Sequence, residues 1–151
     1  MNISTDQSPY WDRSTSSKSF AHPLDLDRFV QRVPRDAAVL DYGCGHGRLC
    51  HALSQRGYHR VLGVDSSSAM IQVARANHPG LDFSVVQSGE LPFPDASFGA
   101  VLLFAVLTCI PSSADQARLM ADVHRVLRPG GCLVISDYPL QTTASNATRS
   151  P

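Results

Sequence analysis

"VLDYGCGHGRL", residues 39–49, places three glycines within five positions, directly after an apolar run. Gly43, Gly45 and Gly47 can adopt positive φ angles and leave no Cβ between the backbone and an approaching atom. Open parallel sheets bind ligands beyond the carboxyl ends of their strands, which is where such a loop would lie. The alternative is a tight strand-to-helix turn without a ligand, so the surrounding sequence has to decide.

Short apolar runs of strand length recur along the chain, and amphipathic helical segments separate most of them. We expect strands at 37–40, 61–64, 83–86, 100–104 and 133–136. We expect helices at 24–33, 48–55, 69–77 and 116–127, with "RPGG" at 128–131 ending the last helix and turning into the fifth strand. This alternation predicts an α/β fold with a doubly wound parallel sheet.

Length and composition favour one domain with a small-molecule ligand. The 151 residues carry thirteen basic and thirteen acidic side chains, a balance that favours neither nucleic acid nor an anionic membrane as a partner. The longest uncharged apolar stretch, 100–110, is about half of the roughly 20 residues that a membrane span requires. The N-terminus does not read as a secretory signal, and the four cysteines are scattered, so we expect a cytoplasmic protein with reduced thiols. We expect a flexible arm at 1–20, a domain at 21–138 and a disordered tail at 139–151.

Asp65 is the second feature that points to a ligand. It follows the second expected strand, 22 positions after Gly43, where a βαβ unit places a carboxylate that accepts the hydroxyls of a ribose. The alternative role for this residue is to cap the next helix. Residues 66–68 are all serine and offer caps of their own, which leaves the acid for the ligand.

A dinucleotide and S-adenosylmethionine both fit a glycine loop followed by an acid. The dinucleotide motif is G-x-G-x-x-G, whereas this loop is G-x-G-x-G, with Arg48 at the position of the last glycine. Asp41 lies two residues before the first glycine, and a pyrophosphate beside it would cost on the order of 1 to 4 kcal/mol. S-adenosylmethionine carries a sulfonium and an ammonium, which Asp41 would attract. Charge therefore favours S-adenosylmethionine over NAD.

Four blocks in this order resemble the class I S-adenosylmethionine-dependent methyltransferases that act on small molecules: "VLDYGCGHGRL", "VLGVDSSSAM", "SGELPFPDASFGAVLLFAVLTCI" and "VHRVLRPGGCLVISDY". The resemblance, to the domain 11/25-like methyltransferases, covers about residues 37–138 and implies a Rossmann-like sheet of about five strands in the order 3-2-1-4-5. It implies S-adenosyl-L-methionine as the cofactor and a small molecule as the methyl acceptor.

The resemblance also implies roles for individual residues. The loop with Asp41, Gly43, Cys44, Gly45 and Gly47 would face the methionine part and the ribose, and Asp65 would hold the ribose hydroxyls. The residues expected near the adenine are Ser66, Met70, Gln87 and Ser88, with Gln87 at a position that is usually acidic. The backbone of Phe104 would meet the methionine amino group, and Tyr10 and Arg13 in the N-terminal arm would reach its carboxylate.

Methyl transfer from a sulfonium needs approach geometry, desolvation and, for some acceptors, a base, so no fixed catalytic triad is expected. Titratable or polar residues near the strand ends or in the arm are candidates for a base, although each is more often a bystander: Tyr10, His22, His46, Thr108, Asp137 and Tyr138. The spacing of Cys44, His46, Cys50 and His51 matches no common zinc pattern, and no metal site is expected.

The resemblance further implies an antiparallel strand pair after the fifth strand, which the polar residues 139–151 cannot form. We therefore interpret the chain as truncated, with an exposed edge on the fifth strand that a second copy could cover. Two other functions stay open. One is a binding module for S-adenosylmethionine without catalysis, and the other is an NAD(P)-dependent oxidoreductase.

Overall fold

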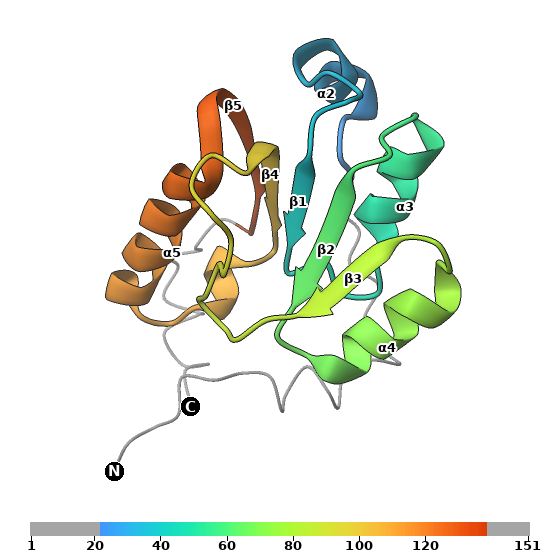
Figure 1. The fold of residues 1–151 in the computed structure, drawn as a ribbon. Coiled ribbons are helices and arrows are strands. Elements are labelled where there is room, and N and C mark those ends of the chain that lie inside the picture. The colour runs from blue at the N-terminus through green and yellow to red at the C-terminus, as the bar shows by residue number, and fades with distance from the viewer. Residues whose placement is uncertain (1–21, 139–151) are drawn as a thin grey trace.

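The computed structural model describes residues 22–138 and contains a parallel β-sheet with helices on both faces (Figure 1). Its strands are β1 (Val39–Tyr42), β2 (Val61–Asp65), β3 (Asp82–Val85), β4 (Phe98–Phe104) and β5 (Leu127–Ser136). Its helices are α2 (Leu26–Arg32), α3 (Arg48–Gln55), α4 (Ser68–Asn77), the 3-10 turn η1 (Leu107–Cys109) and α5 (Ser113–Val126). The predicted arm, with Tyr10 and Arg13, and the predicted tail at 139–151 lie outside the described residues.

The five strands run parallel in the order β3-β2-β1-β4-β5, as predicted. β1 lies at the centre, where Val39 is paired with Val61 of β2 and with Ala100 of β4. Because all strands run in one direction, their carboxyl ends meet at the same edge of the sheet. The glycine loop that follows β1 therefore begins between the ends of β2 and β4.

The sheet separates two apolar clusters, and β1 contributes alternate side chains to each. Val39 packs in a cluster that includes Phe29 of α2, Leu53 of α3 and Ile71 of α4. Leu40 packs in a second cluster with side chains from α5, such as Leu119 and Val123. All strand residues of β1 are buried, Asp41 included.

Local signals fix the ends of the first described helix. The Asp25 side chain accepts a hydrogen bond from the Arg28 N–H, so α2 begins at Leu26, two residues after the predicted start. Pro34 follows the C-cap residue Val33 and cannot continue the helix. α3 has the predicted bounds, and α4 begins one residue earlier than predicted.

The prediction for "RPGG" is wrong in one respect. These residues do end α5, but residues 128–131 belong to β5 and are not a turn before it. Leu127 pairs with Phe98 and Cys132 pairs with Ala100, so the β5 side carries extra residues in an irregular register. Gly130 has a φ of 76°, a conformation that glycine adopts without strain and that accommodates this bulge.

Within residues 22–138, no helix combines the length and the apolar character that a membrane span needs.

Candidate functional site

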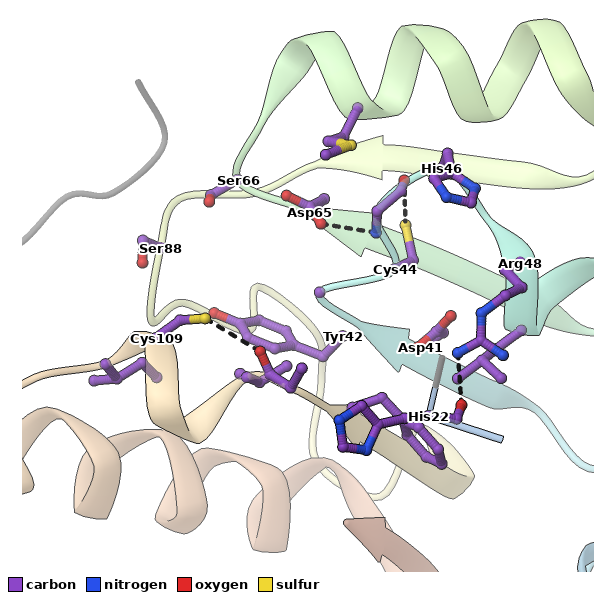
Figure 2. A pocket seen from close by; sticks show the side chains of 18 residues that line it. His22, Asp41, Tyr42, Cys44, His46, Arg48, Asp65, Ser66, Ser88 and Cys109 are labelled. Atoms are coloured by element: carbon purple, nitrogen blue, oxygen red, sulfur yellow. Dashed lines mark hydrogen bonds between the residues drawn. The ribbon is translucent and has the colours of Figure 1, made fainter. Parts of the chain in front are cut away.

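A cavity opens at the carboxyl ends of β1, β2 and β4 (Figure 2). We call it the glycine-loop cavity. Its lining residues are His22, Asp41, Tyr42, Gly43, Cys44, Gly45, His46, Arg48, Leu49, Asp65, Ser66, Met70, Ser88, Phe104, Ala105, Val106, Cys109 and Ile110. A second, larger cavity of about 670 Å³, the adjoining cavity, shares Ser66, Ser88, Cys109 and Ile110 with the first. The two cavities therefore meet at residues that follow β2, β3 and β4.

The glycine loop combines positive φ angles with backbone hydrogen bonds to β2. Gly43, Gly45 and Gly47 have φ values of 74°, 54° and 87°. The N–H groups of Gly43 and Cys44 both donate to the Val64 carbonyl oxygen, at 2.8 and 3.0 Å, and so join the loop to β2. A Cβ on Gly45 would meet no atom within 4 Å, so its backbone borders open space. That space is where a ligand can approach the main chain.

Gly47 does not line the cavity. It precedes α3, and a Cβ on this residue would come within 2.6 Å of the Phe83 ring and 3.1 Å of the His78 ring. Its place in the loop is explained by close packing of the loop against β3 and the end of α4.

Asp65 lies beside the glycine loop, as its spacing predicted, but its carboxylate is already engaged. Oδ2 accepts from the Gly45 N–H and Oδ1 accepts from the Ser67 N–H, each at 2.9 Å. Ser67 caps α4 by accepting from the Met70 N–H at 3.1 Å. A serine is thus the cap of α4, as expected. The expectation that this leaves Asp65 free for the ligand needs correction, because its carboxylate also accepts from two backbone N–H groups. The Asp65 carboxylate holds the glycine loop in place, and Asp65 lines the cavity.

Asp41 is more deeply buried than the charge argument assumed. It is 1% exposed, and the Cys50 thiol donates to its Oδ2 at 3.5 Å. Burial raises the pKa of Asp41 to about 7, with a further increase from Asp65, while the bond from Cys50 and the nearby Arg48 lower it. This group is therefore only partly ionised at neutral pH. Its repulsion of a pyrophosphate is weaker than that of a full charge, and a bound cation would favour its ionised form.

The structure brings most of the other predicted contacts to the same place. Cys44, Ser66, Met70, Ser88 and Phe104 line the glycine-loop cavity. Gln87 lines the adjoining cavity instead.

Several lining residues were not predicted. They are Tyr42, Arg48, Leu49, Ala105, Val106, Cys109 and Ile110. The position of Ala105 and Val106 directly after a central strand is the signal that could have found these two. Ala105 has a φ of 54°, unusual for a residue with a side chain, and its N–H donates to the Ser136 carbonyl oxygen at 2.8 Å. The chain thus turns sharply at the end of β4 and presents Val106 to the cavity.

Comparison with known protein families matches residues 40–135 to the family described as "Methyltransferase domain". The match includes the second and third blocks that carry the resemblance in full, the first from its second residue and the fourth up to residue 135. The chain belongs to the class I methyltransferases.

Individual relatives agree with this assignment. The chain is 35% identical over 143 residues to a "Probable S-adenosylmethionine-dependent methyltransferase" of Mycolicibacterium smegmatis, a match that covers 94% of this chain and 50% of the relative. It is 32% identical to the 27-O-demethylrifamycin SV methyltransferase of Amycolatopsis mediterranei, covering 87% and 50%. The crystal structure of a SAM-dependent methyltransferase from Methanosarcina mazei superposes with a TM-score of 0.67 at 31% identity, covering 75% of this chain and 57% of that one. The chain spans about half the length of the curated relatives it matches.

The candidate bases of this methyltransferase domain have different surroundings. His22 and His46 line the cavity, and the Nδ1 atom of His22 lies 2.9 Å from Ser136 Oγ. Asp137 accepts from the Leu107 N–H at 2.8 Å and from Thr108 Oγ1 at 2.6 Å, so both Thr108 and Asp137 serve to hold η1. Tyr138 packs edge-on against His22. His22 and His46 are thus the described candidates that border the site.

The residues weighed for a metal site have other partners. The Cys50 thiol donates to Asp41, and the ring of His51 stacks on that of His78 at 4.7 Å. Across residues 22–138, no group of three or more His, Cys, Asp or Glu side chains is arranged to hold a metal ion.

Proposed function

We propose that the glycine-loop cavity binds S-adenosylmethionine and that the protein transfers the methyl group to a small-molecule acceptor. The observation that carries this proposal is the hydrogen bond from the Gly45 N–H to Asp65. It joins the glycine loop to the carboxylate that is expected to bind the ribose hydroxyls, at one wall of the cavity. Family membership supports it. The relative from Amycolatopsis mediterranei is named for a small molecule, rifamycin, which supports an acceptor of that kind.

The contacts support an assignment of the ribose, adenine and methionine parts of the ligand to different residues of the site. The bonds from Gly45 and Ser67 hold the Asp65 carboxylate at the cavity, and a carboxylate offers about four acceptor positions in all, so it can also accept from ribose hydroxyls. Ser66, Met70, Gln87 and Ser88 are proposed to surround the adenine. Asp41, the loop and the Phe104 backbone are proposed to face the positively charged methionine end.

S-adenosylmethionine supplies an activated methyl carbon on a sulfonium. The chain contributes orientation and exclusion of water, for which the apolar wall formed by Phe104, Val106 and Ile110 is suited. His22 and His46 are the described residues that could accept a proton from an acceptor hydroxyl or amine.

Titration calorimetry with S-adenosylhomocysteine and with NADH tests the proposal. We expect the wild-type chain to bind the first ligand and not the second. Asp65→Ala should weaken binding by about tenfold or more, because hydrogen bonds to charged groups contribute about 1.5 to 3 kcal/mol. Ser67→Ala is the matched control, because it removes the α4 cap next to Asp65 but keeps the carboxylate.

Binding of NADH in place of the nucleoside would favour the oxidoreductase. Binding of S-adenosylhomocysteine without methyl transfer to any acceptor in a broad panel would favour the non-catalytic module.

We also propose a cytoplasmic location, supported by the free cysteines among residues 22–138. Burial raises the pKa of the thiols of Cys44 and Cys50, which keeps both neutral.

A further inference from the structure

Tyr42 is a large polar side chain in an apolar place. It is the last residue of β1 and packs, only 7% exposed, in the cluster with Leu40, Val64, Val86 and Val106. Burial is the main cause that raises the pKa of Tyr42, so its phenol is neutral at neutral pH. A buried hydroxyl is costly unless it is hydrogen-bonded, so its partner matters.

That partner is a backbone group far along the chain. The Tyr42 hydroxyl oxygen accepts from the Gly89 N–H at 2.8 Å, across 47 residues of sequence. Gly89 is the third residue of a four-residue turn, Gln87–Glu90, which the Glu90 N–H closes by donating to the Gln87 carbonyl oxygen at 3.0 Å. The φ of Gly89 is 79°, and a type II turn requires a positive φ at its third residue. The turn leaves the Gly89 N–H unused, and Tyr42 accepts from it.

The same turn forms the β3 side of the site. Ser88 lines the glycine-loop cavity together with Asp65, and the whole turn from Gln87 to Glu90 lines the adjoining cavity. Figure 2 shows the Tyr42 side chain extending from β1 toward the side of the cavity where Ser88 and Cys109 lie. One phenol therefore connects the strand that carries the glycine loop to the turn that faces it across the cavity.

We propose that Tyr42 is a positioning residue whose hydroxyl holds the Gln87–Glu90 turn at the distance from the glycine loop that the nucleoside of the ligand requires. The inference rests on the proposed function, since it assigns the wall beside Asp65 to the nucleoside. It predicts that loss of the hydroxyl weakens binding of the nucleoside half of the ligand and leaves the interactions of the amino-acid half unchanged.

The test is titration calorimetry on Tyr42→Phe with two probes, S-adenosylhomocysteine and 5′-methylthioadenosine, which lacks the amino-acid part. We expect the affinity for both probes to fall by the same factor, about three- to tenfold, as for the loss of one buried hydrogen bond. Tyr58→Phe is the matched control. It removes another phenol hydroxyl of a buried tyrosine, which donates to the Val33 carbonyl oxygen at 2.6 Å away from the cavity, and it should leave both affinities unchanged.

Three results would overturn the inference while the proposed function stands: unchanged affinity of Tyr42→Phe for both probes, a loss confined to S-adenosylhomocysteine, or an equal loss in Tyr58→Phe. A wild-type chain that binds neither probe would overturn the proposed function and, with it, this inference. A second measurement does not depend on the stability of a variant. Hydrogen exchange of the Gly89 amide in the wild-type chain should slow on addition of S-adenosylhomocysteine, and an unchanged rate would also contradict the role.

Discussion

Asp41 is a carboxyl group that folding takes almost completely out of water. Burial raises its pKa from 3.8 to about 7, so the folded chain binds this proton more tightly than the unfolded chain. Folding stability from this group is fully present below pH 4 and is lost as the pH rises to about 7. The loss over that range is on the order of 4 kcal/mol, and the contribution is constant at higher pH.

We therefore expect Asp41→Asn to gain stability relative to the wild type as the pH rises from 5 to 7, with a plateau above. An amide oxygen can still accept from the Cys50 thiol, so the variant removes the ionisation and keeps the contact. Urea unfolding at pH 5, 6, 7 and 8 measures the difference. Asp36→Asn, at an exposed position, is the control and should show no such trend. A difference between Asp41→Asn and the wild type that does not vary with pH would contradict the assignment.

The residues of the site differ in how far sequence could identify them. Asp65 was found because its distance from the glycine loop is fixed by one βαβ unit, a local constraint. Its bond to Gly45 was not foreseen, because that bond depends on how two loops approach each other. Tyr42 was not singled out for the same reason, since the partner of its hydroxyl group is 47 residues away in the sequence. Spacing along the chain predicts which side of the sheet a residue borders, but not which polar groups meet there.

At the scale of elements, a close approach around Gly63 determines how β2, β3 and α3 pack. Gly63 lies in the middle of β2, and a Cβ there would come within 2.7 Å of the Phe83 ring and 2.9 Å of Cys50 Sγ. Phe83 belongs to β3 and Cys50 to α3, so both elements pack directly over the β2 backbone. A larger residue would force them apart.

Gly63→Ala should accordingly destabilise the fold by about 1 to 3 kcal/mol, the usual cost of overpacking. Thermal or urea unfolding checks the value. Phe83→Leu in the same chain should recover part of the loss because it gives the new methyl group room, and the double-mutant cycle isolates this coupling. Strictly additive effects of the two substitutions would show that Phe83 is not what the methyl group meets.

Periodicity predicted the elements themselves well. The five strands and the four described α-helices follow from apolar runs between turn residues, and the bounds of α3 agree with the prediction. The strand order, which the structure confirms, was implied by the resemblance to methyltransferases and not by periodicity. The exception is "RPGG", where glycine and proline indicated a turn before the fifth strand. In the structure Leu127 is paired with Phe98, so the strand begins before these residues and continues through them as a bulge. Turn signals in a sequence do not distinguish a connection from an irregularity inside a strand.

At the scale of the whole molecule, β5 is the last strand of the described sheet. β5 pairs with β4 on one side, and its run Cys132–Ser136 carries no charge that would discourage pairing on the other. Ile135 in this run is 44% exposed. We propose that a second copy of the chain covers this edge, with two β5 strands side by side about a twofold axis.

Sedimentation equilibrium of the wild-type chain should then show a dimer, and Ile135→Lys should shift it to monomer because a charge would be buried at the new interface. Val85→Lys is the matched control, because Val85 is similarly exposed, at 49%, on β3 at the opposite edge of the sheet. Ile135→Lys should keep the wild-type affinity for S-adenosylhomocysteine, since Ile135 lines neither the glycine-loop cavity nor the adjoining cavity. A monomeric wild-type chain, or dissociation by Val85→Lys as well, would exclude β5 as the contact. Loss of nucleoside binding in the Ile135→Lys monomer alone would mean instead that the second copy completes the site.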